Sequence, residues 1–253
     1  MTATASSTPS STRGTRLVQP KKGKGRNFAC PFHFWSYNNQ GELTSIPEKQ
    51  HFGETYHFSR LHKSTLGQIF ISDVLAYEEF GRNHRFVFPS RRIEKLRETP
   101  REEWSLIQGA ILLYYLFPNI QFIMGRGTIS LVKIYPDKAN PGRSITRIHH
   151  YFSKRLLEAK EEAAATGGEV LSAENVYDPE IQFSALPDIK ATTEVFDSTI
   201  EQEDYVMGAM TQKAVEAGML DKLIFGRNEP ALHHFHNSYR EALGMEPLEV
   251  YGG

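Results

Sequence analysis

Alternating apolar and polar residues in the middle of the chain predict an antiparallel sheet. Asn119–Met124 and Thr128–Tyr135 read as the two strands of a hairpin, with Gly125-Arg126-Gly127 as its turn. Ser144–Phe152 alternates in the same way and predicts a third antiparallel strand. The run Arg85–Phe88 predicts a short strand that ends where a proline follows.

Capping and stop signals predict helices on either side of these strands. Thr99-Pro100-Arg101-Glu102 is a capping box with proline at the first helical position, which predicts a helix through Trp104 to about Tyr114. Leu156–Ala165 is rich in helix formers and is followed by two glycines. A final helix is expected to begin near Asn228-Glu229-Pro230.

One further helix carries a candidate site residue. Ser198-Thr199-Ile200-Glu201 reads as a capping box that opens this helix, and Gly218 as its C-terminal stop. Asp204 shares a helical face with Ile200, Met207 and Thr211. An acid on a partly apolar face needs a partner, which a metal ion would supply, whereas a solvated acid beside Glu203 is the simpler alternative.

The N-terminal part of the chain differs in composition from the rest. Residues 2–12 are mostly Ser, Thr and Ala, and no Asp or Glu occurs before Glu42. We expect residues 1–12 to be a disordered leader, with an organelle transit peptide as the alternative. The segment that follows predicts a small β unit, with a turn at Asn38–Gly41 leading into a strand at Glu42-Leu43.

Overall composition is that of an ordinary globular protein. The 253 residues are 40% hydrophobic and 23% charged, with a net charge of -1, which argues against a general nucleic-acid binder. No apolar run reaches the roughly 18 residues of a membrane span. A single cysteine, Cys30, excludes an intrachain disulfide and fits a reducing, cytoplasmic compartment.

The segment Glu54-Thr-Tyr-His-Phe-Ser-Arg-Leu-His62 concentrates the candidate chemistry. It places a carboxylate and two imidazoles, His57 and His62, within nine residues. Two histidines and a distant carboxylate form the facial triad of non-haem Fe(II) oxygenases. The i, i+5 spacing separates the side chains by about 140° on a regular helix, so a shared metal requires a distorted turn. Two structural histidines are the alternative.

Other histidines could form a second cluster. His233, His234 and His236 lie in the last predicted helix, where they are either metal ligands or a solvated face. His149 and His150 point to opposite faces of a strand and cannot converge.

Cys30-Pro31-Phe32-His33, followed by Trp35-Ser36-Tyr37 and a glycine turn, resembles the second ligand loop of a Rieske 2Fe–2S domain. Together with Glu54, His57 and His62, this loop makes the chain resemble the α (large) subunit of Rieske non-haem iron ring-hydroxylating oxygenases. The family's first ligand loop ends in Arg-Gly, which matches residues 13–14. That alignment places Ser10 and Thr12 where the family has cysteine and histidine.

The resemblance implies an α+β, helix-grip (START/SRPBCC-like) antiparallel sheet with helices, preceded by a partial Rieske-like β domain. It implies boundaries of 13–53 for the Rieske-like domain and 54–253 for the catalytic domain. It also implies a mononuclear Fe(II) held by His57, His62 and Asp204. Glu54 matches the residue that couples a neighbouring subunit's Rieske centre to the iron, and Cys30 and His33 match cluster ligands. In the family a long segment precedes the histidine pair, whereas here only residues 34–56 separate His33 from His57, as though an internal segment were deleted near Gly53.

The implied activity is O2-dependent hydroxylation of an aromatic or apolar substrate, with a reductase or ferredoxin as partner and a trimer-like homo-oligomer. Serine and threonine do not replace thiolate and imidazole at a Rieske iron, so we predict that this chain alone holds no 2Fe–2S cluster. The alternatives are a catalytically inactive subunit of such an oxygenase and a zinc hydrolase using the same His/His/Asp site.

Overall fold

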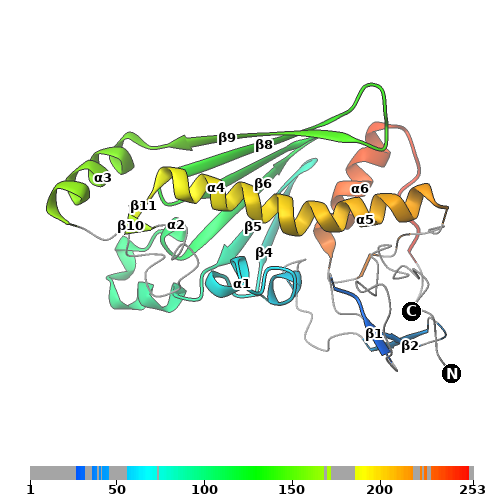
Figure 1. Cartoon of the computed structure of the whole chain (residues 1–253), viewed down its shortest axis with the longest axis horizontal. Coiled ribbons are helices and arrows are strands. Elements are labelled where there is room, and N and C mark those ends of the chain that lie inside the picture. The colour runs from blue at the N-terminus through cyan, green and yellow to red at the C-terminus, as the bar shows by residue number, and fades with distance from the viewer. Residues whose placement is uncertain are drawn as a thin grey trace.

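The computed structural model describes residues 27–31, 36–38, 40, 42–45, 56–72, 74–167, 170–171, 186–218, 223, 225–226 and 229–250. Their architecture is α+β, as predicted: a six-stranded antiparallel sheet, a long helix laid across it and further helices at both ends (Figure 1). No described helix is both long enough and apolar enough to cross a membrane.

The large sheet is a simple meander in which each strand pairs with the next one in the chain. Its strands are β4 (Ala76–Phe80), β5 (Asn83–Pro89), β6 (Ala110–Leu116), β7 (Ile120–Gly125), β8 (Thr128–Pro136) and β9 (Ser144–Phe152). The predicted hairpin is confirmed, with Gly127 at a φ of 70° in its turn, a conformation that favours glycine. The strands predicted at residues 85–88 and 144–152 are also confirmed.

The helix predicted from Thr99 to about Tyr114 is wrong. The chain makes short 3-10 turns at Ile93–Glu98 and Arg101–Glu103, one helical turn α2 (Leu106–Gly109), and then enters strand β6. The capping box that forms is Ser105 with Gln108, whose Oε1 accepts from the Ser105 N–H at 3.0 Å. A continuous apolar run is compatible both with a buried helix and with a strand that has neighbours on both sides. Here the run forms a strand because it pairs with β5 and β7.

A long helical segment crosses the sheet and carries the candidate ligand Asp204 (Figure 1). It consists of α4 (Ile189–Thr199), a π-helical turn (Ile200–Asp204) and α5 (Tyr205–Glu216), and it ends at Gly218, as predicted, with a φ of 65°. The predicted start at Ser198 is wrong, because Asp188 caps the segment by accepting from the Ala191 N–H at 2.8 Å. The Ser198 hydroxyl instead donates to the Val195 carbonyl inside the helix.

Two more helices were predicted and are confirmed. Helix α3 (Lys154–Thr166) follows β9 and ends at Gly167, whose φ is 73°. Helix α6 (Pro230–Ala242) begins with the expected proline and covers one end of the sheet (Figure 1). A two-stranded parallel pair, β10 (Val170–Leu171) with β11 (Leu186–Pro187), completes the described elements of this region.

The predicted β unit is present near the N-terminus. Strands β1 (Asn27–Ala29), β2 (Ser36–Asn38) and β3 (Leu43–Ser45) form an antiparallel sheet. The Asn38 side chain closes the predicted turn by accepting from the Gln40 and Glu42 N–H groups at 3.0 and 2.9 Å. The leader at residues 1–12 and the junction at Gly53 lie outside the described residues.

A small apolar core fixes the segment that carries the two histidines. Phe58, on the 3-10 turn Tyr56–Ser59, packs with Ile69 and Phe70 at the end of helix α1 (Leu66–Ile69). Gly67 lets the two segments approach, since a Cβ there would lie 2.5 Å from the Phe58 carbonyl oxygen and 2.8 Å from that of His62. The histidine segment is therefore held against α1 by backbone contact.

Candidate metal centre

A distorted turn brings His57 and His62 together. The His57 carbonyl accepts from the N–H groups of residues 60 and 61 at 2.9 and 2.7 Å, which closes a 3-10 turn. His62 lies beyond that turn, and its carbonyl accepts from the Thr65 and Gly67 N–H groups at 3.0 and 2.8 Å. The two ring centroids are 5.0 Å apart. The requirement for a distorted turn at i, i+5 spacing is thus met.

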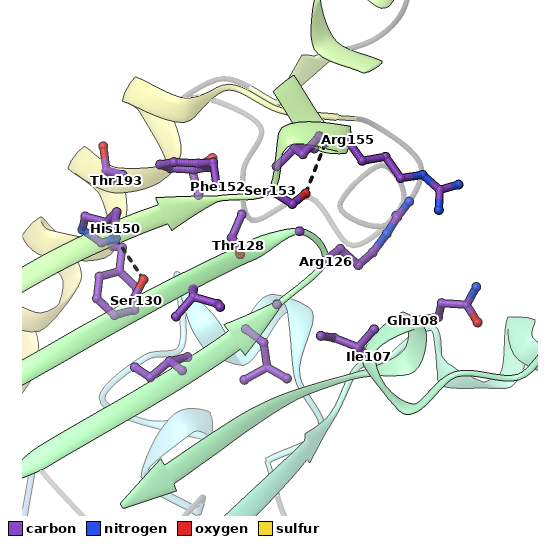
Figure 2. Close-up of a pocket in the computed structure, with 18 of the residues that line it drawn as sticks. Ile107, Gln108, Arg126, Thr128, Ser130, His150, Phe152, Ser153, Arg155 and Thr193 are labelled. Atoms are coloured by element: carbon purple, nitrogen blue, oxygen red, sulfur yellow. Dashed lines mark hydrogen bonds between the residues drawn. The ribbon is translucent and has the colours of Figure 1, made fainter. Parts of the chain in front are cut away.

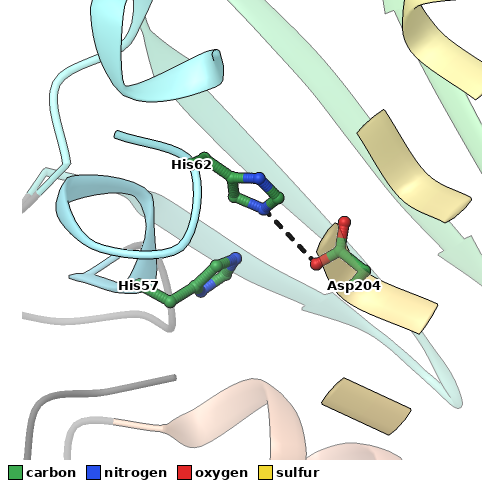
Figure 3. A group of neighbouring side chains, drawn as sticks. All are labelled: His57, His62 and Asp204. Atoms are coloured by element: carbon green, nitrogen blue, oxygen red, sulfur yellow. Dashed lines mark ion pairs between the residues drawn. The ribbon is translucent and has the colours of Figure 1, made fainter. Parts of the chain in front are cut away.

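The long helix supplies Asp204 to the same point (Figure 3). Its carboxylate Oδ1 lies 3.3 Å from His62 Nε2, and one ligand atom from each of His57, His62 and Asp204 lies within 4.8 Å of the others. Asp204 is the last residue of the π-helical turn, and such bulges are frequent at functional sites. Among the described residues this is the one cluster of three or more His, Cys, Asp or Glu side chains with the spacing of a metal site.

Glu203 orients the buried His62, a role that sequence reasoning did not assign. Its Oε2 accepts from His62 Nδ1 and also from the Thr65 hydroxyl at 2.8 Å. Burial lowers the pKa of His62, but hydrogen bonds and negative charge from Asp204 and Glu203 outweigh that effect and raise it above the ordinary value. In the neutral tautomer with Nδ1–H, the Nε2 lone pair faces Asp204. In the sequence, the adjacent acids at 203–204 were the signal that a second carboxylate lies near this histidine.

Phe58 lies beneath both imidazoles and limits their movement. Its ring makes edge contacts with His57 at a centroid distance of 4.9 Å and with His62 at 5.2 Å. The Phe58 ring also stacks on Phe88 of strand β5, with ring centroids 5.7 Å apart. The sheet therefore supports the histidine pair through one aromatic ring.

This donor set fits a divalent transition metal. Nitrogen and oxygen ligands about 2.1 Å from one ion lie about 3.0–3.4 Å from each other, and the His62 Nε2–Asp204 Oδ1 distance of 3.3 Å falls in this range. Two imidazoles and one carboxylate suit Fe(II) and leave positions open, and the same donors also bind zinc. A carboxylate on the second nitrogen of a ligating histidine, as on His62, is the usual supporting interaction.

The predicted Rieske-like ligands cannot all be placed. Cys30 follows strand β1 and is fully buried. His33 and Glu54 lie outside the described residues, as do Ser10 and Thr12. Their assignments remain predictions.

The other histidines make separate, partly buried contacts. His234 of α6 donates from Nε2 to the Gly81 carbonyl at 2.8 Å, and its Nδ1 lies 3.1 Å from that of His84. His236 stacks on Phe225, with ring centroids 4.7 Å apart. The three α6 histidines have intermediate exposure, and within the described part of the chain they do not gather as a metal site. His150 contacts Ser130 at 2.9 Å.

Comparison with known sequences identifies the family. The family model described as the ring hydroxylating alpha subunit (catalytic domain) matches residues 50–245, which is most of the chain. The chain belongs to this family. A Rieske [2Fe–2S] domain model matches residues 12–63, so the two matches overlap around the predicted boundary at residues 53 and 54. The boundary itself remains a prediction.

Curated members of the family share a limited segment with this α-subunit chain. The large oxygenase component of the naphthalene 1,2-dioxygenase system is 35% identical over 77 residues in both Pseudomonas fluorescens and Pseudomonas putida. The large oxygenase component of the 2,4-dinitrotoluene dioxygenase system of a Burkholderia species is 32% identical over the same length. Each match covers 30% of this chain and 15% of the relative. Ring-hydroxylating oxygenases are oxidoreductases, and the resemblance inferred from the sequence is confirmed.

Proposed function

We propose that this chain binds one Fe(II) through His57, His62 and Asp204 and hydroxylates an aromatic or apolar molecule at that ion. The observation that carries the proposal is the convergence of these three ligand atoms to within 4.8 Å. They come from two segments about 140 residues apart in the chain, and they are the residues that match the family's ligand positions. Iron bound there would supply the oxygen-activating chemistry.

The chain's own residues would hold and orient that ion. Glu203 keeps the Nδ1 proton of His62 in place, which leaves Nε2 as the ligand atom. Asp204 contributes the negative charge, and its side chain remains 36% exposed, which leaves one side of the site open. Phe58 excludes water from the protein side of the two imidazoles.

The residues of this chain do not fit a complete Rieske cluster. Such a cluster requires two cysteines and two histidines, whereas Cys30 is the one cysteine in the sequence and is fully buried. We therefore assign no reaction step to a cluster and propose no NADH-driven turnover. Peroxide could replace the electron supply, because it brings both the oxygen atom and the electrons: R–H and H2O2 give R–OH and H2O.

The second candidate function is an inactive subunit that assembles with intact oxygenase subunits. The incomplete set of Rieske ligands favours it. The named relatives are components of multi-protein systems, which supports a reductase or ferredoxin and further α chains in a trimer-like assembly as partners. We place the protein in the cytoplasm, where a single unpaired cysteine is ordinary.

Peroxide-driven oxidation of naphthalene tests the proposal. Protein loaded anaerobically with Fe(II) is expected to give hydroxylated naphthalene, whereas zinc-loaded protein and the Asp204→Ala variant are expected to give none. Protein that holds iron but forms no product would point to the inactive subunit. Ester or amide hydrolysis by the zinc-loaded protein alone would point to the zinc hydrolase.

A further inference from the structure

A cavity of about 550 Å³ lies under the long helix, away from the metal centre. Its walls come from strands β6 to β9 and from helices α2, α3 and α4 (Figure 2). None of His57, His62 and Asp204 lines it. The nearest lining residue on the long helix is Phe196, eight residues before Asp204, which corresponds to about 12 Å along the helix axis.

The inner part of the cavity is apolar and leads toward the metal centre. Ile123 of the sheet and Phe196 of α4 line it from opposite sides. Two further wall residues, Phe70 and Ile111, also belong to the cluster around Phe58. Because the Phe58 ring contacts both candidate iron-binding histidines, the apolar wall ends next to the metal centre.

Two arginines line the opposite end of the cavity. Arg126, in the β7–β8 turn, and Arg155, in α3, both line it, and Figure 2 draws their side chains extending in the same direction, away from His150. No Asp or Glu occurs among the described residues that line the cavity. His150 is held by Ser130 at 2.9 Å and by Asp197 at 3.2 Å, so it provides a polar side wall.

We propose that this cavity binds an elongated apolar or aromatic carboxylic acid. The carboxylate lies at Arg126 and Arg155, whose planar guanidinium groups match it in geometry and charge. The apolar body extends past Ile123 toward Phe70. A volume of about 550 Å³ is in the range of small-molecule sites. Binding of the acid does not depend on the proposed function. Only the further step, that the bound acid is a substrate, rests on the proposed function, and oxidation then occurs at the end remote from the carboxylate.

Equilibrium binding of one charged and one neutral probe tests the proposal. The probes are 6-(2-naphthyl)hexanoate and the corresponding alcohol, titrated into the full chain by calorimetry. The acid is expected to bind at least about tenfold more tightly than the alcohol. Arg126→Gln and Arg155→Gln are each expected to weaken binding of the acid by about tenfold and to leave the alcohol unchanged.

Arg147→Gln is the matched control. Arg147 lies on strand β9, like His150 and Phe152, but at the opposite parity, so it projects from the other face of the sheet, where it packs over Tyr135. Its loss is expected to leave binding of both probes unchanged. All three arginines are exposed, so the variants should fold normally, which circular dichroism checks.

Equal affinity for acid and alcohol, or unchanged acid binding in both cavity variants, would overturn the proposal. Loss of acid binding in a folded Asp204→Ala variant would also overturn it, because the acid would then occupy the metal centre. If the acid binds as expected while the wild-type protein takes up no iron, the cavity assignment stands and the proposed function fails.

Discussion

Acidification from pH 7 to pH 5 is expected to weaken the fold through one buried imidazole, His84. The side chain is only 4% exposed, and its ring stacks on Tyr115 at a centroid distance of 4.9 Å. Burial, followed by repulsion from His234, lowers the pKa of His84 from 6.5 to about 4. His234 Nε2–H already donates to the Gly81 carbonyl, so in the contact between the two Nδ1 atoms His84 Nδ1–H donates and His234 Nδ1 accepts.

The sign and size of the effect follow from proton linkage. Between pH 6.5 and pH 4 the unfolded chain binds a proton that folded His84 does not, so stability falls as the pH falls. A pKa lowered from 6.5 to about 4 corresponds to a loss of about 2 kcal/mol between pH 7 and pH 5, and of about 3 kcal/mol once the pH is well below 4. The stability due to neutral His84 is therefore complete above about pH 6.5.

Urea unfolding followed by circular dichroism at pH 7, 6 and 5 measures this loss. A His84→Gln variant is expected to be less stable at pH 7 but to lose about 2 kcal/mol less than the wild type on going to pH 5. His149→Gln, which replaces an exposed histidine of β9, controls for the general effect of removing an imidazole. An identical pH dependence in the wild type and His84→Gln would refute the argument.

Three further predictions concern the metal centre and the electron supply. Gly67→Ala should lower the free energy of unfolding by about 1–3 kcal/mol, because a Cβ at this position would lie within 2.8 Å of two carbonyl oxygens. Thermal unfolding measures this loss, and an unchanged melting temperature would refute the prediction. Glu203→Gln should weaken iron binding about 10–100-fold and should retain the fold. An anaerobic Fe(II) titration measures the affinity, and equal affinity in the variant and the wild type would mean that the contact of Glu203 with His62 does not support iron binding. Reconstitution with iron and sulfide followed by reduction should give no Rieske paramagnetic resonance signal, because Cys30 is the single cysteine; such a signal would mean that other residues complete the cluster.

The sheet was largely predictable because strand patterns are local. Alternation marked residues 119–135 and 144–152, and the glycine turn at 125–127 indicated the pairing of 119–124 with 128–135. Both errors, the helix predicted over residues 99–114 and the helix start predicted at Ser198, arise because the surrounding structure overrides a local signal. Ala110–Leu116 is apolar on every position and becomes a strand only because β5 and β7 flank it. Ser198 lies within a helix that Asp188 already caps, so its own capping signal is overridden.

The sequence predicted the cluster of His57, His62 and Asp204, but it did not predict the contacts that support this cluster. His57, His62 and Asp204 carry the family's motif, whereas the contact between Glu203 and His62 joins residues 141 positions apart and depends on where the helix crosses the sheet. The charged cavity has no local signal either. Arg126 and Arg155 look like ordinary surface residues in the sequence, and they line one cavity because α3 packs beside the β7–β8 turn.

Iron content measured by metal analysis tests the central claim most directly. Wild-type protein loaded anaerobically with Fe(II) and freed of excess metal is expected to hold one iron per chain, and folded Asp204→Ala is expected to hold almost none. Glu201→Ala removes an exposed acid from the same π-helical turn and should keep the wild-type iron content. Iron retained at the wild-type level by Asp204→Ala would contradict the assignment of His57, His62 and Asp204 as the metal centre.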